Sequence, residues 1–219
     1  MRKADLIQAI EQAIGVLAPS YRRGASESDL YEASLLMLCV EAAVKAGGSE
    51  FITNDGHSAA PAFHFRRSPG NLWLGEFTYA YVEFPNPQKS LEIHLGVYVV
   101  GRSKVAHECD VAIIDHQEAE RSRLGGVHPR QGKVIAAIEA KHYSNSPGLS
   151  VGRSFLGLTQ ELTADNCALV YPSKSSVSLG GLIAQKRSHA FEEVLPGRPA
   201  ATLLSSHLET KIRKWLARL

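Results

Sequence analysis

The chain has few of the residues that would assign it to several common protein classes. It has only three cysteines in 219 residues, spaced too widely to form a disulfide framework. No Cys-x-x-Cys or His-x-x-x-His spacing occurs, so the usual ligand patterns of a structural zinc site are absent. No apolar run approaches the roughly 18 residues of a membrane span, and no signal peptide is visible. These absences predict a reduced, cytoplasmic protein with no membrane partner.

Strong net charge is also missing. The formal net charge is only +2, so any attraction to nucleic acid must be local, for example at the basic dipeptides Arg22-Arg23, Arg66-Arg67 and Lys186-Arg187. The chain shows no internal repeat or low-complexity block, and 44% hydrophobic residues are enough for one sizeable core. We therefore expect residues 1–219 to form one domain.

Two apolar segments end in charged residues, which are rare in strands and rarely buried without a partner. The first is Asp110-Val-Ala-Ile-Ile, and the second is Val134-Ile-Ala-Ala-Ile-Glu139-Ala-Lys141. Successive side chains in a strand point to opposite faces, so Glu139 and Lys141 must share a face. If the two strands are neighbours, two carboxylates and an ammonium group converge.

This set of residues suits a hard divalent cation. The carboxylates of Asp110 and Glu139 and the main-chain carbonyl of Ala140 offer the oxygen ligands that Mg²⁺ or Mn²⁺ prefers. Such an ion activates water and stabilises the charge that develops on a phosphodiester during hydrolysis. Lys141 would orient or help to deprotonate the attacking water and stabilise the phosphate.

A simpler interpretation makes Asp110 a strand-entry residue and Glu139 and Lys141 a surface charge pair, as in sheets with one wet face. Against it, every residue from Val134 to Ile138 is apolar, which indicates burial on both faces of that strand. We therefore favour a functional site.

The arrangement resembles the PD-(D/E)xK nuclease superfamily, whose signature is an acidic residue opening one strand and Glu-x-Lys near the end of the next. Cys109 stands where the family name has proline, a position without a chemical role. The resemblance implies an α/β fold of the restriction-endonuclease-like class, with a mixed central sheet flanked by helices in α-β-β-β-α-β order.

A similar order of elements is predicted from residue patterns. The expected core covers about residues 28–173, with added helices at 4–18 and 205–218 and a loop-rich insertion from Gly47 to Gly70. Ser28 is expected to cap the first core helix. The other expected elements are a helix at 30–44, strands at 73–84, 91–100, 110–114 and 134–142, a helix at 150–162 and a strand at 167–171.

The resemblance also implies that further residues join the catalytic group. Some members carry a glutamate on the first core helix, where this chain has Glu32 and Glu41; these lie on opposite helix faces, and we prefer Glu32. A carboxylate complementing the helix dipole is an equally good interpretation of Glu32. Gln160 matches a glutamine of some subfamilies, although an exposed helical amide is the simpler interpretation. His142 should point away from Lys141 and pack.

Arg153 begins the helix after the Glu-x-Lys strand, where a guanidinium and free backbone N–H groups could hold a phosphate of nucleic acid. The expected function is a Mg²⁺-dependent endonuclease that cuts double-stranded DNA in restriction, defence or mobile-element processing. A homodimer or a partner protein would supply recognition. The alternative is a catalytically idle scaffold of the same fold that binds nucleic acid or protein.

Overall fold

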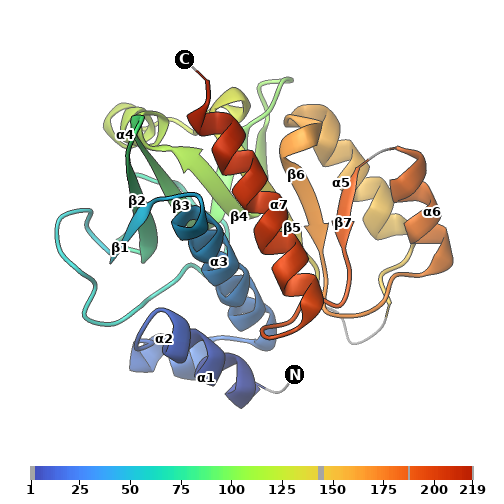
Figure 1. Ribbon diagram of the computed structural model, residues 1–219, viewed down its shortest axis with the longest axis horizontal. Helices are drawn as coiled ribbons and strands as arrows, with labels where there is room; N and C mark the ends of the chain where they lie inside the picture. The colour runs from blue at the N-terminus through green and yellow to red at the C-terminus, as the bar shows by residue number, and fades with distance from the viewer. Residues whose placement is uncertain (1–2, 143–145, 187, 219) are drawn as a thin grey trace.

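The computed structural model describes residues 3–142, 146–186 and 188–218. Its centre is a seven-stranded mixed sheet whose strands follow one another in chain order (Figure 1). Pairing is antiparallel from β1 to β5 and parallel from β5 to β7. The strands are β1 (Ser49–Thr53), β2 (Tyr79–Pro85), β3 (Gln88–Val100), β4 (Ala106–Asp115), β5 (Val134–Ala140), β6 (Cys167–Val170) and β7 (His189–Phe191).

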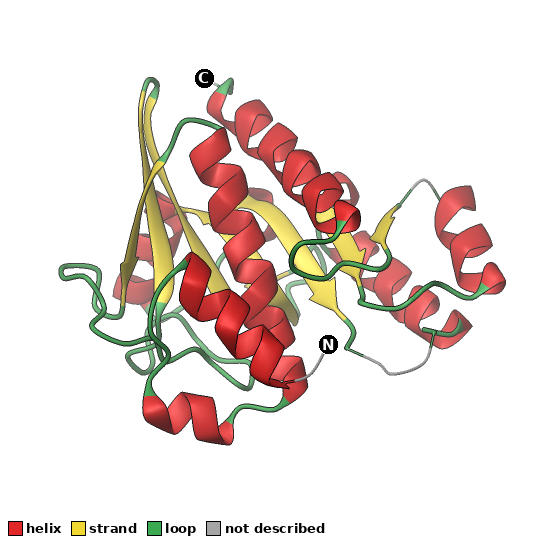
Figure 2. Cartoon of the chain, turned by 60° about the horizontal axis from the view of Figure 1, so that its bottom comes forward, coloured by secondary structure: helices red, strands yellow, loops and turns green. Residues whose placement is uncertain are grey.

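Helices cover both faces of this sheet, so the expected α/β class is confirmed (Figure 2). On one face lie α1 (Lys3–Ala13), α3 (Glu27–Lys45) and α7 (Pro199–Leu216), with α2 (Pro19–Gly24) beside them. On the other lie α4 (His116–Gly125), α5 (Leu149–Glu161) and α6 (Val177–Gln185). Two 3-10 turns, Gln131–Lys133 and Ala164–Asn166, lead into β5 and β6.

The first core helix starts earlier than expected. Ser26, not Ser28, is its N-cap, because Asp29 follows three residues later and completes a reciprocal capping box. The Asp29 amide donates to Ser26 Oγ at 3.1 Å, and the Ser26 amide donates to Asp29 Oδ2 at 2.6 Å. Residues 73–78, expected to be strand, precede β2, and the stretch expected to be an insertion contains β1.

Helix α7 docks on the body of the protein, beside α3 (Figure 1). It starts at Pro199 rather than near Ser205, since proline at its first position needs no hydrogen bond for its nitrogen. Its apolar stripe is buried, with Leu204, Leu208 and Ile212 in the same cluster as α3. Across the described part of the chain, the helices lack the combination of length and apolar character that crossing a membrane requires.

Strand β3 changes faces partway along its length. Leu95 belongs to the apolar cluster under α3 and α7, whereas Val97, two residues on, belongs to the cluster on the opposite face. In a regular strand these two side chains would share a face. The exchange occurs at Gly96, whose φ of 54° lies in the left-handed region.

Strand β4 makes the same exchange beside it. Cys109 pairs with Val97 and Val111 pairs with Leu95, so Asp110 stands opposite Gly96. Cys109 lies in the cluster with α5 and Val111 in the cluster with α3. Asp110 was expected to open its strand, but β4 starts at Ala106 and Asp110 lies within the strand, where its faces cross over.

The bend depends on the absence of a side chain at Gly96. A β-carbon there would lie 3.2 Å from the Ser68 carbonyl oxygen and would hold an L-residue at a positive φ. Gly96→Ala should therefore lower the free energy of unfolding by about 1–2 kcal/mol in urea denaturation. Gly181→Ala in α6 is the control, because a β-carbon added there would have no surrounding heavy atom within 4 Å. This change should be neutral or slightly stabilising. Equal effects of the two changes would contradict this role of Gly96.

Candidate functional site

The three charged residues predicted from the sequence meet at one point of the sheet. Lys141 Nζ lies 2.6 Å from Glu139 Oε1 and 3.8 Å from Asp110 Oδ2. The Asp110 carboxylate also accepts a hydrogen bond from the Ala140 amide, at 2.6 Å. This last bond ties β4 to the end of β5 and fixes the direction of the Asp110 side chain.

The strand period accounts for the shared face of Glu139 and Lys141. Ile138 and Ala140 pack in the cluster under α3 and α7, so the residues between and after them must point the other way, toward α5. Lys141 directly follows β5 and keeps its direction, since its amide donates to the Val170 carbonyl at 2.9 Å. The neighbouring His142 packs against Tyr31 of α3, with ring centroids 5.3 Å apart, as expected.

These side chains open into a cavity of about 400 Å³ between the sheet and α5. Helix α5 presents Ser154, Gly157 and Leu158 to it, at the i, i+3, i+4 spacing of one helix face. Strand β4 adds His107 and Glu108, which sequence analysis did not select. His107 and Glu108 stand three and two residues before Asp110, so a longer strand would have placed them near it. The strand was expected from the sequence to begin at Asp110, and these two residues were therefore not included.

Two carboxyl groups at this end of the sheet have raised pKa values. Burial, then the nearby negative charge of Glu139, raises the pKa of Asp110 to about 7, against a partial opposing effect of Lys141. Burial, then the charge of Asp110, raises the pKa of Glu32 to about 8. Glu32 on α3 therefore lies within electrostatic reach of Asp110. It is not among the described residues that line the cavity, and its membership of the catalytic group stays a prediction. Among the described residues that line the cavity, three carboxyl groups, those of Glu108, Asp110 and Glu139, accompany one lysine, Lys141.

The remaining predicted residues lie outside the cavity. Glu41, the alternative to Glu32, is exposed on α3 and pairs with Lys45. Arg153 and Gln160 are both exposed on α5, and neither is among the described residues that line the cavity. A role for Gln160 in catalysis and for Arg153 in nucleic-acid binding stays a prediction.

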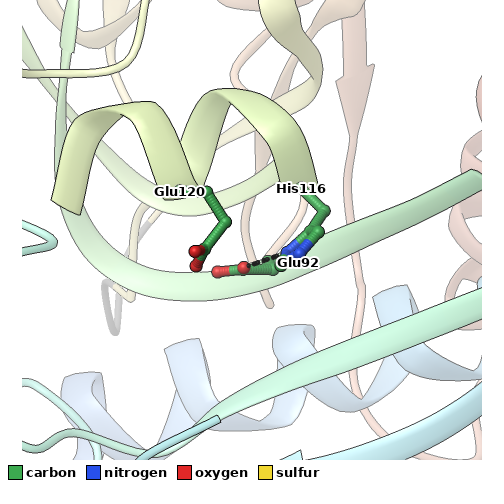
Figure 3. Close-up of side chains that lie close together, drawn as sticks. All are labelled: Glu92, His116 and Glu120. Atoms are coloured by element: carbon green, nitrogen blue, oxygen red, sulfur yellow. Dashed lines mark hydrogen bonds and ion pairs between the residues drawn. The ribbon is translucent and has the colours of Figure 1, made fainter. Parts of the chain in front are cut away.

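A second polar cluster lies elsewhere on the sheet. Glu92 of β3 points toward α4, where His116 Nδ1 lies 2.6 Å from Glu92 Oε1 and Glu120 lies alongside (Figure 3). Within the described residues, these three form the group whose ligand atoms all lie within 4.8 Å of one another. The cluster could hold a metal ion.

The charges of this second cluster are already compensated. Arg123 donates to both oxygens of Glu92 and also to Glu120, and His94 Nε2 lies 2.7 Å from Glu92 Oε2. Burial alone would raise the pKa of Glu92, but hydrogen bonds from Arg123, His116 and His94 outweigh it and hold that pKa well below its usual range. A cation bound here would compete with the Arg123 guanidinium for the same oxygens.

Comparisons with known proteins add no family to this description. No protein-family model, curated protein or solved structure matches the chain. The geometry of the two clusters is therefore the basis for assigning a function.

The raised pKa of Asp110 predicts a pH-dependent stability. Because the pKa is 3.8 for an ordinary aspartate and about 7 in the fold, the folded chain keeps a proton that the unfolded chain releases between those values. The contribution of Asp110 to the free energy of unfolding therefore falls as pH rises from 4 to 7. Asp110→Asn keeps an acceptor for the Ala140 amide but cannot ionise. It should raise the free energy of unfolding by about 1–3 kcal/mol at pH 8 and leave it nearly unchanged at pH 4.

Urea denaturation at the two pH values measures this difference. Glu41→Gln serves as the control because Glu41 is an exposed carboxylate. It should have little effect at either pH. A gain for Asp110→Asn of the same size at pH 4 and pH 8 would show that the charge of Asp110 is not what destabilises the fold.

Proposed function

We propose that the protein is a metal-dependent nuclease that hydrolyses phosphodiester bonds of DNA at the cavity formed by Asp110, Glu139 and Lys141. The observation that carries the proposal is the convergence of two carboxylates and one ammonium group, 2.6 and 3.8 Å apart, in an open cavity beside the bend of β4. A surface charge pair would not need a buried aspartate, yet Asp110 is only 8% exposed.

The donor set fits Mg²⁺ or Mn²⁺. Asp110, Glu139 and the carbonyl of Ala140 would hold the ion, since hard cations prefer carboxylate and carbonyl oxygens. The raised pKa of Asp110 accords with this choice, since it comes first from burial and then from the negative charge of Glu139, which Lys141 offsets only in part. At Glu92, by contrast, the Arg123 guanidinium supplies that compensation. When bound, the ion would activate water and stabilise the charge developing on the phosphate.

The protein's own residues have distinct tasks in this proposal. Lys141 is held between two carboxylates, from where its ammonium group orients the attacking water and counters the extra charge on the phosphate. Glu32, with a pKa of about 8, keeps its proton near neutral pH and so limits the repulsion around Asp110. Glu108 adds a third carboxylate on the same side, and its pKa is raised by burial and then by Glu139.

The order of elements supports a restriction-endonuclease-like core. Helix α3, the antiparallel strands β3, β4 and β5, helix α5 and strand β6 occur in the α-β-β-β-α-β order that the resemblance to PD-(D/E)xK nucleases implies. Strands β1 and β2 are additional elements after α3, and α4 is an additional helix between β4 and β5. Asp110 and the Glu139-x-Lys141 pair stand on neighbouring strands, as in that signature. Double-stranded DNA is the proposed substrate, with a homodimer or partner protein supplying sequence recognition.

Two matched substitutions test which cluster acts. Glu139→Gln removes one charged ligand but keeps the side-chain shape, and should reduce cleavage by at least about 100-fold. Glu120→Gln makes the same change in the Glu92 cluster and should leave cleavage within about twofold of wild type. The assay is incubation of supercoiled plasmid, linear duplex and single strands with the purified protein in Mg²⁺, Mn²⁺ or EDTA.

Circular dichroism of both variants distinguishes loss of activity from loss of fold. Full activity of Glu139→Gln, or cleavage unaffected by EDTA, would contradict the assignment of the site. Activity lost only in Glu120→Gln would move the catalytic centre to the Glu92 cluster. The absence of cleavage by the wild-type protein on all three substrates would favour the idle scaffold.

A further inference from the structure

A second cavity, of about 340 Å³, lies at the turn between β3 and β4. One wall is the turn itself, with Gly101, Arg102 and Lys104. The opposite wall is the segment that enters β5, from Arg130 to Lys133. Val100 joins the two walls, because it forms a bridge with Arg130 and its amide donates to the Pro129 carbonyl at 2.8 Å.

The lining of this cavity is strongly basic. Arg102, Lys104, Arg130 and Lys133 all line it, and among the described residues no acidic side chain does so. The whole chain has a net charge of only +2, so these four cations are a local concentration of charge. Arg102, Lys104 and Lys133 are exposed and form no ion pair with any described residue. Their charge is available to an anion.

Arg130 is fixed in place by a buried carboxylate. Its Nη2 lies 2.6 Å from Glu118 Oε2, and its amide donates to Glu118 Oε1 at 2.8 Å. Glu118 is 2% exposed and also accepts from Arg121. Because two guanidinium groups share one carboxylate, the group keeps a net positive charge, and Arg130 is held rigidly at the cavity without being neutralised.

The basic cavity and the proposed catalytic cavity lie on two sides of one wall. That wall consists of Gly101, His107 and Glu161: His107 lines the catalytic cavity, and its Nε2 lies 3.5 Å from Glu161 Oε2. Gly101, which lines the basic cavity, packs so closely that a β-carbon would lie 2.8 Å from His107 Cδ2. The two cavities are therefore neighbours, close enough for one extended polyanion to contact both.

We propose that the basic cavity binds a backbone phosphate of the nucleic-acid strand whose scissile phosphate lies at Asp110 and Glu139. The inference rests on the proposed function and adds to it a subsite for the substrate backbone. Contacts of this kind position the strand and do not read its sequence. The four cations would thus set the register of the strand relative to Lys141.

The test compares two double variants that each remove two positive charges. Arg102→Ala/Lys133→Ala alters the basic cavity, and Arg198→Ala/Lys214→Ala alters two exposed cations at the start and near the end of α7 as the matched control. Fluorescence anisotropy with labelled duplex DNA, single-stranded DNA and RNA measures binding in EDTA, so that cleavage does not interfere. Each titration is repeated over a series of salt concentrations.

The cavity variant should bind at least about tenfold more weakly than wild type near 0.1 M salt. The slope of its affinity against salt concentration should correspond to about two fewer counterions released on binding. The control should stay within about twofold. All three probes share the sugar–phosphate backbone, so each can bind the cavity. Comparison of their affinities shows which type of nucleic acid the protein prefers. Equal affinities and equal salt slopes for the two variants, or no binding by the wild type, would overturn the proposal.

Cleavage kinetics separate this inference from the proposed function. For a positioning subsite, Arg102→Ala/Lys133→Ala should raise KM about tenfold with kcat within about threefold of wild type. Wild-type cleavage together with unchanged KM in the cavity variant would overturn the subsite and leave the nuclease assignment intact. Cavity-dependent binding without wild-type cleavage would overturn the nuclease assignment and support the cavity as a nucleic-acid site.

Discussion

The exchange of sheet faces at Gly96 and Asp110 is the constraint on which the site depends. Without it, the outer half of the β3–β4 hairpin would continue straight, and Val97 would face α3 instead of the cluster that contains Phe155 of α5. The bend also releases the Asp110 side chain from regular alternation and lets it accept from the Ala140 amide. One glycine with a positive φ thus shapes the apolar core and the candidate site together.

The two carboxylate clusters of the sheet differ in how far their negative charge is compensated. Glu92 is buried, and its oxygens contact one guanidinium and two imidazole groups. Removing the Arg123 guanidinium would leave a buried carboxylate without its main positive charge and would lower the free energy of unfolding. Asp110 shares one ammonium group with Glu139 and carries a raised pKa. A buried carboxyl group with a raised pKa lowers stability once it ionises, and such groups are found more often at functional sites than elsewhere in proteins.

Local patterns in the sequence were enough to predict the α/β class and the common face of Glu139 and Lys141, because both follow from the two-residue strand period. The contacts between helices and the faces of the sheet could not be predicted from the sequence. Glu92 and His94 alternate with apolar residues and suggest a wet face, but α4 covers them through Arg123, which is 31 residues away from Glu92. Similarly, helix periodicity places Ser154 at the cavity rather than Arg153, a distinction that requires knowing which face of α5 packs on the sheet.

The strictly sequential strand order has a consequence for synthesis on the ribosome. Each strand pairs with the one made just before it, so the sheet can grow as the chain emerges, without waiting for distant partners. The face under α3 is an exception, because Leu204, Leu208 and Ile212 of α7 cover it and are made after the strands of the sheet. A nascent chain therefore exposes part of that apolar face after the sheet has formed, and chaperones would be needed most in the interval before α7 docks.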